Sequence, residues 1–174
     1  IMIEKKIAVL GCGNIGTAIV KGLIRAKVKA TNINITRRKK GSLNDLKKTG
    51  CMVTNNQKAV IESNIIILSV GPSQILELIN EISPHLDKKH LIISIVAGIS
   101  ISKIQNRINH QIPIIRAMPN TAASLCESMT CLASKNRFSK ELKVAKNLFD
   151  KIGTTLIIDE TKMSSATALC ACGI

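Results

Sequence analysis

Uninterrupted aliphatic runs are the feature of this chain that most restricts its fold. The clearest cover residues 64–70 (NIIILSV) and 91–96 (LIISIV), and in neither do polar and apolar residues alternate. A strand with one face in water shows such alternation, so these runs predict strands that are buried on both faces. Segments with helical periodicity separate the runs, and strands interleaved with helices form βαβ units around a parallel sheet. The sequence therefore predicts an α/β fold.

The same alternation extends over most of the chain. Strands are predicted at residues 6–10, 32–35, 51–53, 64–70, 91–96, 112–117, 129–133 and 155–158. Helices are predicted at residues 17–26, 42–48 with Ser42 as the cap, 57–62, 73–82, 101–108 and 140–151. We expect residues 1–159 to form one domain with helices on both faces of the sheet. A helical pattern from Thr161 towards Cys172 has no visible partner, so we expect residues 160–174 to begin a helical domain whose remainder is absent.

The charge of the chain leaves several classes of partner to consider. Twenty-five Lys and Arg residues against 11 Asp and Glu residues give a net charge of +14, which suits nucleic acid, a membrane surface or an anionic ligand. However, the basic residues are scattered, and a chain with two Phe and no Trp or Tyr has few rings to stack on bases. No apolar run reaches the 18 residues that a membrane helix needs. We therefore expect neither a nucleic acid nor a membrane as partner.

The six cysteines do not predict a metal site. They are Cys12, Cys51, Cys126, Cys131, Cys170 and Cys172, none of them in a C-x-x-C pair. The three histidines lie far from them in sequence and show no ligand spacing, so no zinc site is expected. Since no secretory signal pattern is present either, we expect free thiols and a cytoplasmic protein.

A glycine-rich hexapeptide joins the first predicted strand to the first predicted helix. It reads Gly11-Cys12-Gly13-Asn14-Ile15-Gly16, and in this strand–turn–helix context G-x-G-x-x-G is typical of a Rossmann-type dinucleotide site. Gly11 permits the tight turn, Gly13 lets the backbone approach a pyrophosphate, and Gly16 lets the helix pack on the strand. The helix amino terminus offers free N–H groups to the phosphates. The alternative is a glycine-rich turn without a ligand.

The residues at the end of the second predicted strand bear on which dinucleotide binds. An acid there would accept hydrogen bonds from the ribose 2′-OH of NAD, but this chain has Thr36-Arg37-Arg38. A guanidinium binds a phosphate in bidentate fashion, so the sequence favours NADP(H), with NAD(H) also possible. The alternative is a solvated basic loop.

Three further small-residue turns follow predicted strands. Gly71-Pro72, Ala97-Gly98 and Pro119-Asn120 stand at carboxyl ends of strands, the sheet edge where α/β proteins bind ligands, and they leave room for a flat nicotinamide ring. No Lys, His or Tyr is placed as a general acid. That absence suits imine reduction better than ketone reduction, in which an alkoxide must gain a proton. Asn120 could instead only cap its own loop, and Arg116 could be a solvated charge.

Several stretches together resemble the pyrroline-5-carboxylate reductases. They are residues 7–16 (IAVLGCGNIG), 69–72 (SVGP), 94–99 (SIVAGI) and 116–121 (RAMPNT), with a weaker match at 167–169 (TAL). The resemblance covers essentially the whole chain, and RAMPNT is its most specific motif. Members of this family reduce 1-pyrroline-5-carboxylate to L-proline with NAD(P)H, the last step of proline biosynthesis. They carry a carboxy-terminal helical domain that builds dimers and larger rings, so the resemblance implies a homo-oligomer formed through that domain.

The resemblance also implies roles for individual residues. Cofactor contacts would fall on Leu10, Gly11, Cys12, Gly13, Asn14, Ile15 and Gly16, on Thr36, Arg37 and Arg38, near Gln57, on Ser69, Val70, Gly71 and Pro72, and on Ile95, Val96 and Ala97. The nicotinamide and substrate side would comprise Met118, Pro119, Asn120, Thr121 and Glu160.

The chain departs from the family pattern in two places. Gly71 stands where the family usually has Lys, and residues 170–174 read CACGI instead of Ser-Gly-Ser-Gly-Pro. The catalytic residue would lie beyond Ile174, so we expect this stretch alone to be inactive. Two alternatives stay open: another NADP-dependent reductase of the β-hydroxyacid dehydrogenase type, with a catalytic Lys in a later helical domain, or a non-catalytic NADP-binding module if the chain is complete.

Overall fold

The strands of this chain form one mixed sheet in the computed structural model, which describes residues 5–38, 43–137 and 139–168. Within these residues the sheet has eight strands in the order β3-β2-β1-β4-β5-β6-β7-β8. The strands are β1 (Ile7–Leu10), β2 (Ile33–Thr36), β3 (Met52–Val53), β4 (Ile65–Leu68), β5 (Leu91–Ser94), β6 (Ile114–Met118), β7 (Ser128–Ala133) and β8 (Gly153–Ile157). The first six run parallel to one another.

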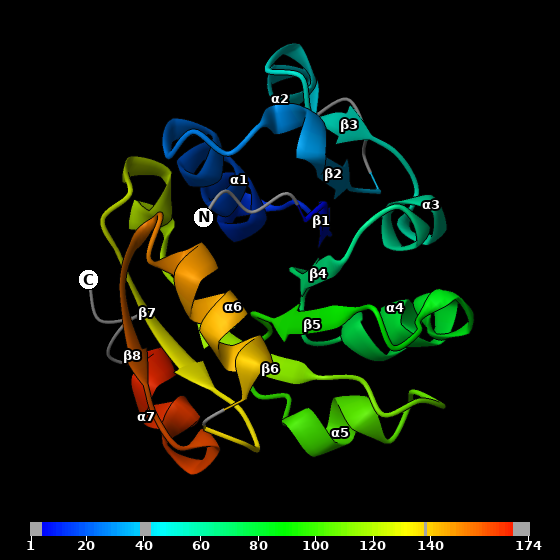
Figure 1. Ribbon diagram of the computed structural model, residues 1–174, viewed down its shortest axis with the longest axis vertical. Coiled ribbons are helices and arrows are strands. Elements are labelled where there is room, and N and C mark those ends of the chain that lie inside the picture. The colour runs from blue at the N-terminus through cyan, green and yellow to red at the C-terminus, as the bar shows by residue number, and fades with distance from the viewer. Residues whose placement is uncertain (1–4, 39–42, 138, 169–174) are drawn as a thin grey trace.

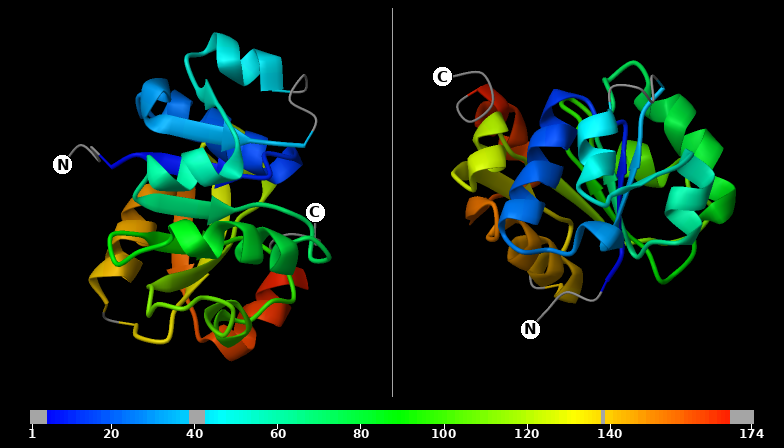
Figure 2. Two further views of the ribbon diagram at one scale, coloured as in Figure 1. Left: turned by 90° about the vertical axis from the view of Figure 1, so that its right-hand side faces the viewer. Right: turned by 90° about the horizontal axis from the view of Figure 1, so that it is seen from above.

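Helices cover both faces of the sheet, as predicted (Figures 1 and 2). On one face lie α1 (Asn14–Arg25), α2 (Asn44–Lys48) and α6 (Lys140–Phe149). On the other lie α3 (Asn56–Ile61), α4 (Ile75–Ile82) and α5 (Ile101–Gln105). The central strands send alternate side chains to the two layers: Ile65 and Ile67 of β4 pack under α1, whereas Ile66 and Leu68 pack under α4. This two-sided burial explains why the aliphatic runs carry no polar alternation.

The predicted parallel core is confirmed over β1–β6, and the sheet departs from parallel pairing at one place. Strand β7 runs antiparallel to β6, with Ala117 opposite Leu132, and β8 then runs parallel to β7. Only residues 119–127 connect β6 to β7, which is shorter than the dozen or more residues that a parallel crossover needs. A 3-10 turn, η4 (Thr121–Leu125), fills this connection and packs on α1 at Gly22, where a Cβ would overlap the carbonyl of Ala123.

The ends of several elements differ from the predicted bounds. Strand β4 stops at Leu68, because Ser69 and Val70 already turn towards α4, and α5 ends at Gln105. The helical pattern after Asp159 begins as a 3-10 turn, η5 (Glu160–Lys162), and continues as α7 (Met163–Ala166), which packs on β7. The predicted cap Ser42 and the region from residue 169 to Cys172 lie outside the described residues.

The described residues contain neither a membrane-crossing helix nor a cluster of metal ligands. No helix found there has the length and apolar character to cross a bilayer. No group of three or more His, Cys, Asp or Glu side chains in the same residues is arranged to hold a metal ion. The cysteines that the structure describes, Cys12, Cys51, Cys126 and Cys131, are free thiols, whereas Cys170 and Cys172 lie outside the described ranges.

Candidate functional site

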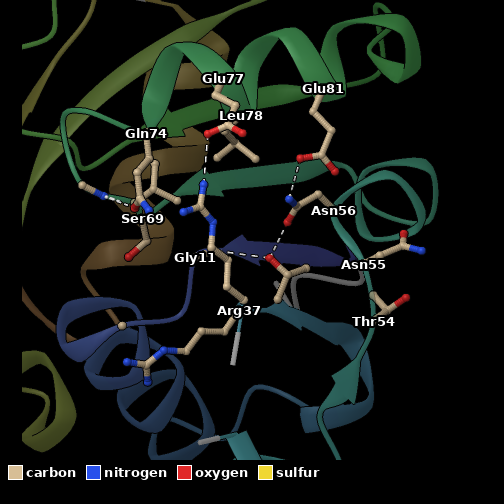
Figure 3. Close-up of a pocket in the computed structure, with 15 residues that line it drawn as sticks. Gly11, Arg37, Thr54, Asn55, Asn56, Ser69, Gln74, Glu77, Leu78 and Glu81 are labelled. Carbon is tan, nitrogen blue, oxygen red and sulfur yellow. Dashed lines mark hydrogen bonds and ion pairs between the residues drawn. The ribbon is translucent and has the colours of Figure 1, made fainter. Parts of the chain in front are cut away.

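A cleft of about 550 Å³ opens at the carboxyl ends of β1, β2 and β4 (Figure 3). The sheet order changes direction there, because the chain passes from β1 to β2 on one side and later returns to β4 on the other. Ligands of open α/β sheets bind at such a switch point. The lining comprises Gly11, Gly13, Thr36, Arg37, Arg38, Thr54, Asn55, Asn56, Ser69, Val70, Gly71, Gln74, Glu77, Leu78 and Glu81.

The three glycines of the hexapeptide differ in whether the fold itself requires a residue without a side chain. Gly11 has φ +80°, and a Cβ there would lie 2.9 Å from the carbonyl oxygen of Ser69 and overlap Val70. A Cβ on Gly16 would lie 2.7 Å from Ser69 Oγ, so α1 approaches the end of β4 only because that residue has no side chain. A Cβ on Gly13 would meet no described atom nearer than the Gly11 carbonyl oxygen, at 3.9 Å. The fold itself requires Gly11 and Gly16, and it leaves the space in front of Gly13 empty.

The amino terminus of α1 lies beside this space, because its capping residue Gly13 lines the cleft. Thr17 N–H donates to the Gly13 carbonyl at 2.9 Å and so makes the first bond of the helix. The N–H groups of Asn14, Ile15 and Gly16 precede it, and the capping residue Gly13 has no side chain to accept from them. The first turn also has no acidic residue that would repel an anion. This helix end is therefore suited to a phosphate.

A chain of hydrogen bonds forms the wall next to the glycine loop. Gly11 N–H donates to Thr36 Oγ1 at 3.2 Å, the Thr36 hydroxyl donates to Asn56 Oδ1 at 2.6 Å, and Asn56 Nδ2 donates to Glu81 Oε2 at 2.9 Å. The resemblance implies a cofactor contact near Gln57; Gln57 itself is exposed and does not line the cleft, whereas its neighbour Asn56 does. The first turn of α3 decides between them, because only one of two consecutive helical residues faces the sheet edge.

Two arginines lie at the end of β2. Arg38 Nη2 is 3.0 Å from Glu77 Oε2 of α4, and both side chains are about three-quarters exposed, at 72% and 75%. Arg37 lines the same cleft and forms no ion pair with any residue that the structure describes. At the basic end of the cleft, Arg37 thus pairs with no described acid, whereas Arg38 pairs with the Glu77 carboxylate.

Other residues predicted at the cofactor lie behind the cleft surface. Leu10, Cys12, Ile95 and Val96 are buried in the core, Ile15 packs against it, and Ala97 packs beside Met118. Burial raises the pKa of the Cys12 thiol, with the Thr17 hydroxyl, 3.6 Å away, acting in the opposite direction. A thiol of this kind stays protonated at neutral pH, so the role of Cys12 in the loop is its N–H, which donates to the Thr36 carbonyl at 2.7 Å. Asn14 and Pro72 are exposed and do not line the cleft.

The residues expected on the substrate side form a separate group beyond β5 and β6. Met118 is buried with Cys131 and Met163, and Pro119 is also buried. Asn120 Oδ1 accepts from the Ala122 N–H at 3.1 Å and so caps η4, while Thr121 is exposed. None of these residues lines the cleft.

The buried Arg116 forms an ion pair with the partly buried Glu160, which the sequence did not reveal. Arg116 Nη1 lies 3.5 Å from Glu160 Oε1, and the side chains are only 7% and 28% exposed. The same carboxylate oxygen accepts the N–H of Ile101 at 2.6 Å, so Glu160 ties η5 to the start of α5. The interpretation of Arg116 as a solvated charge is wrong, because β6 carries its side chain inside, where Nε has no described hydrogen-bond partner.

Glu160→Gln is expected to lower the free energy of unfolding by about 2–3 kcal/mol, since it leaves the buried Arg116 charge unpaired. Asp159→Asn is the matched control, because Asp159 pairs with Arg137 at 3.2 Å where both side chains are half exposed, and its loss should cost less than about 0.5 kcal/mol. Urea denaturation of the two variants measures both values. Equal effects would show that the charge of Arg116 is solvated after all.

Comparisons with known proteins agree with this geometry. Residues 6–98 match the family described as NADP oxidoreductase coenzyme F420-dependent. The chain is 40% identical over 185 residues to pyrroline-5-carboxylate reductase 1 of Dictyostelium discoideum, covering 98% of this chain and 34% of that protein. It is 37% identical over 188 residues to pyrroline-5-carboxylate reductase 2 of the same organism, covering 98% and 63%.

A solved structure shows the same fold. The chain superposes on Plasmodium falciparum pyrroline carboxylate reductase with NADP bound with a TM-score of 0.88 and 28% identity, covering 99% of this chain and 64% of that one. The chain therefore spans between about a third and two-thirds of the length of these relatives.

Proposed function

This chain belongs to the pyrroline-5-carboxylate reductase family and corresponds to its NAD(P)-binding domain, and from that premise we propose that it holds the NADPH of an enzyme that reduces 1-pyrroline-5-carboxylate to L-proline. The proposal assigns the enzyme to the last step of proline biosynthesis in the cytoplasm. It divides the chain into a cofactor domain, residues 1–159, and the beginning of a carboxy-terminal helical domain, residues 160–174, through which the enzyme forms homo-oligomers.

The cleft residues fit a dinucleotide. The observation that carries the proposal is the empty space in front of Gly13, enclosed by a loop that needs glycine at positions 11 and 16 for its own packing. Ser69 also lines the cleft, and its Oγ is buried without a described hydrogen-bond partner. Both features are explained if a phosphate-bearing ligand completes the site.

Each part of the cofactor has a proposed place. The N–H groups of Asn14, Ile15 and Gly16 would hold the pyrophosphate, the Thr36–Asn56 wall the adenosine ribose, and Arg37 and Arg38 the 2′-phosphate. The adenine would lie between Thr54 and the α4 wall. When bound, NADPH supplies the hydride that reduces the C=N bond.

The chain's own task is to position the nicotinamide ring. Val70, Gly71, Ala97 and the Met118–Thr121 turn would form its floor at the carboxyl ends of β4, β5 and β6, and of these residues Met118 and Pro119 are buried. A protonated imine already attracts hydride, so this half of the enzyme needs no general acid. Glu160 is proposed to act on the substrate side by holding η5 in place through Arg116 and Ile101.

We expect the chain to bind NADPH about tenfold more tightly than NADH, because an arginine–phosphate contact is a charge-assisted hydrogen bond worth about 1.5–3 kcal/mol, and exposure to solvent reduces it. The fluorescence of the reduced nicotinamide measures both dissociation constants, and the absence of Trp and Tyr removes energy transfer from the protein. Arg37→Gln combined with Arg38→Gln should bring NADPH to the affinity of NADH. Equal affinities in the unmodified chain, or tighter NADH, would contradict the assignment.

A further inference from the structure

Two carboxylates face the basic end of the cleft from α4. Glu77 and Glu81 are one helical turn apart on α4. Both side chains extend from α4 into the cleft, whose opposite wall carries Arg37 and Thr54 (Figure 3). Arg38 and Glu77 are 39 residues apart in sequence, so their 3.0 Å contact joins the β2 wall of the cleft to the α4 wall. A protein carboxylate therefore pairs with one of the two guanidinium groups proposed for the 2′-phosphate.

Another anion can easily replace Glu77 in its ion pair with Arg38. Both partners are exposed, and exposed pairs contribute little free energy, because water competes for each charge. A phosphate monoester carries a charge of about −1.5 to −2 at pH 7 and offers three acceptor oxygens to one guanidinium. A 2′-phosphate can accordingly displace the Glu77 carboxylate, whereas the 2′-hydroxyl of NADH has no charge with which to do so.

We propose that Glu77 is a specificity-determining residue of this cleft: it competes with the 2′-phosphate of NADPH for Arg38 and thereby limits the preference for NADPH over NADH. The inference rests on the proposed function, since it concerns the same cofactor site. Arg37 has no described acid to release, so it provides the basal preference for the phosphate. Binding of NADPH then includes two opposing contributions, the gain of an Arg38–phosphate contact and the loss of the Arg38–Glu77 contact, together with repulsion between Glu77 and the phosphate.

Glu81 offers a built-in comparison. It has the same charge and lies on the same helix face, but it accepts from Asn56 Nδ2 at 2.9 Å, and Asn56 in turn accepts from Thr36. These partners belong to the ribose wall, which NADPH and NADH share. A change at Glu81 should therefore alter both affinities by a similar factor, whereas a change at Glu77 should separate them.

The test is a titration of Glu77→Gln and Glu81→Gln with NADPH and with NADH at low ionic strength. Glu77→Gln is expected to tighten NADPH binding by about three- to tenfold and to leave NADH within about twofold. The gain should shrink in 0.5 M salt, which screens exposed charges, and it should become smaller in an Arg38→Gln background. Both glutamates are exposed, so the variants should melt at the temperature of the unmodified chain.

The outcomes separate this inference from the function on which it rests. If the unmodified chain binds NADPH and Glu77→Gln binds it no more tightly, the competition is refuted and the cofactor assignment stands. If Glu77→Gln weakens NADH binding and leaves the affinity for NADPH unchanged, Glu77 is an acceptor for the ribose hydroxyls. That result would overturn the proposal. If the unmodified chain binds neither cofactor, the proposed function itself fails.

Discussion

Gly13→Val is expected to weaken NADPH binding at least a hundredfold while the protein stays folded. The backbone of Gly13 is extended, with φ −82° and ψ −151°, so it does not need glycine for a positive φ, and no described atom occupies the space that a side chain would enter. The valine methyl groups would instead fill the place proposed for the pyrophosphate. A hundredfold loss corresponds to about 2.7 kcal/mol, which is modest for the loss of a phosphate cradle.

The neighbouring glycines provide the control for this prediction. Gly16→Ala places a methyl group 2.7 Å from Ser69 Oγ, and Gly11→Ala places one at φ +80° against the Ser69 carbonyl, so both should lower the melting temperature clearly. Fluorescence titration and thermal melting of the three variants distinguish loss of the ligand from loss of the fold. A folded Gly13→Val protein with unchanged NADPH affinity would contradict the site.

The elements that could be predicted are those specified by residues adjacent in sequence. The run at residues 64–70 predicts β4 because a strand buried on both faces must be aliphatic throughout, and the hexapeptide predicts its own turn because Gly11 needs a positive φ. The parallel pairing of the strands, such as β1 with β4, follows from the helices that connect them. The reversal at β7 could have been inferred, since nine connecting residues are too few for a crossover, but the local pattern of residues 129–133 is the same in either direction.

The site was less predictable, because its polar contacts join distant segments. Asn56 faces the cleft and Gln57 does not, and that difference depends on the angle at which α3 begins. The pairing of Arg38 with Glu77 depends on how closely α4 approaches β2, which no local pattern reports. Arg116 resembles any basic residue in a strand until η5 brings Glu160 against it. A long-range charge pair is visible only when the fold is known.

Residues 1–174 alone are expected to bind NADPH yet to reduce 1-pyrroline-5-carboxylate at least a thousandfold more slowly than a complete enzyme. All eight strands and both core layers lie within the described residues, so the cofactor domain has its own core. Among the described residues, the proposed substrate side comprises the Met118–Thr121 turn and the Arg116–Glu160 pair. Positioning of reactants accounts for about 7–11 kcal/mol of an enzymatic barrier, and we expect these features alone to supply little of it.

The most direct test of the central claim compares NADPH oxidation by residues 1–174 with that by a chimera in which the remaining part of Dictyostelium discoideum pyrroline-5-carboxylate reductase 2 follows residue 174. NADPH titration of both proteins first establishes that each holds the cofactor, and the Gly13→Val chimera provides the blank. The account predicts imine-dependent NADPH oxidation by the chimera, none above the blank by residues 1–174, and proline as the product. Equal turnover by residues 1–174, or a chimera that binds NADPH and leaves the imine unreduced, would contradict it.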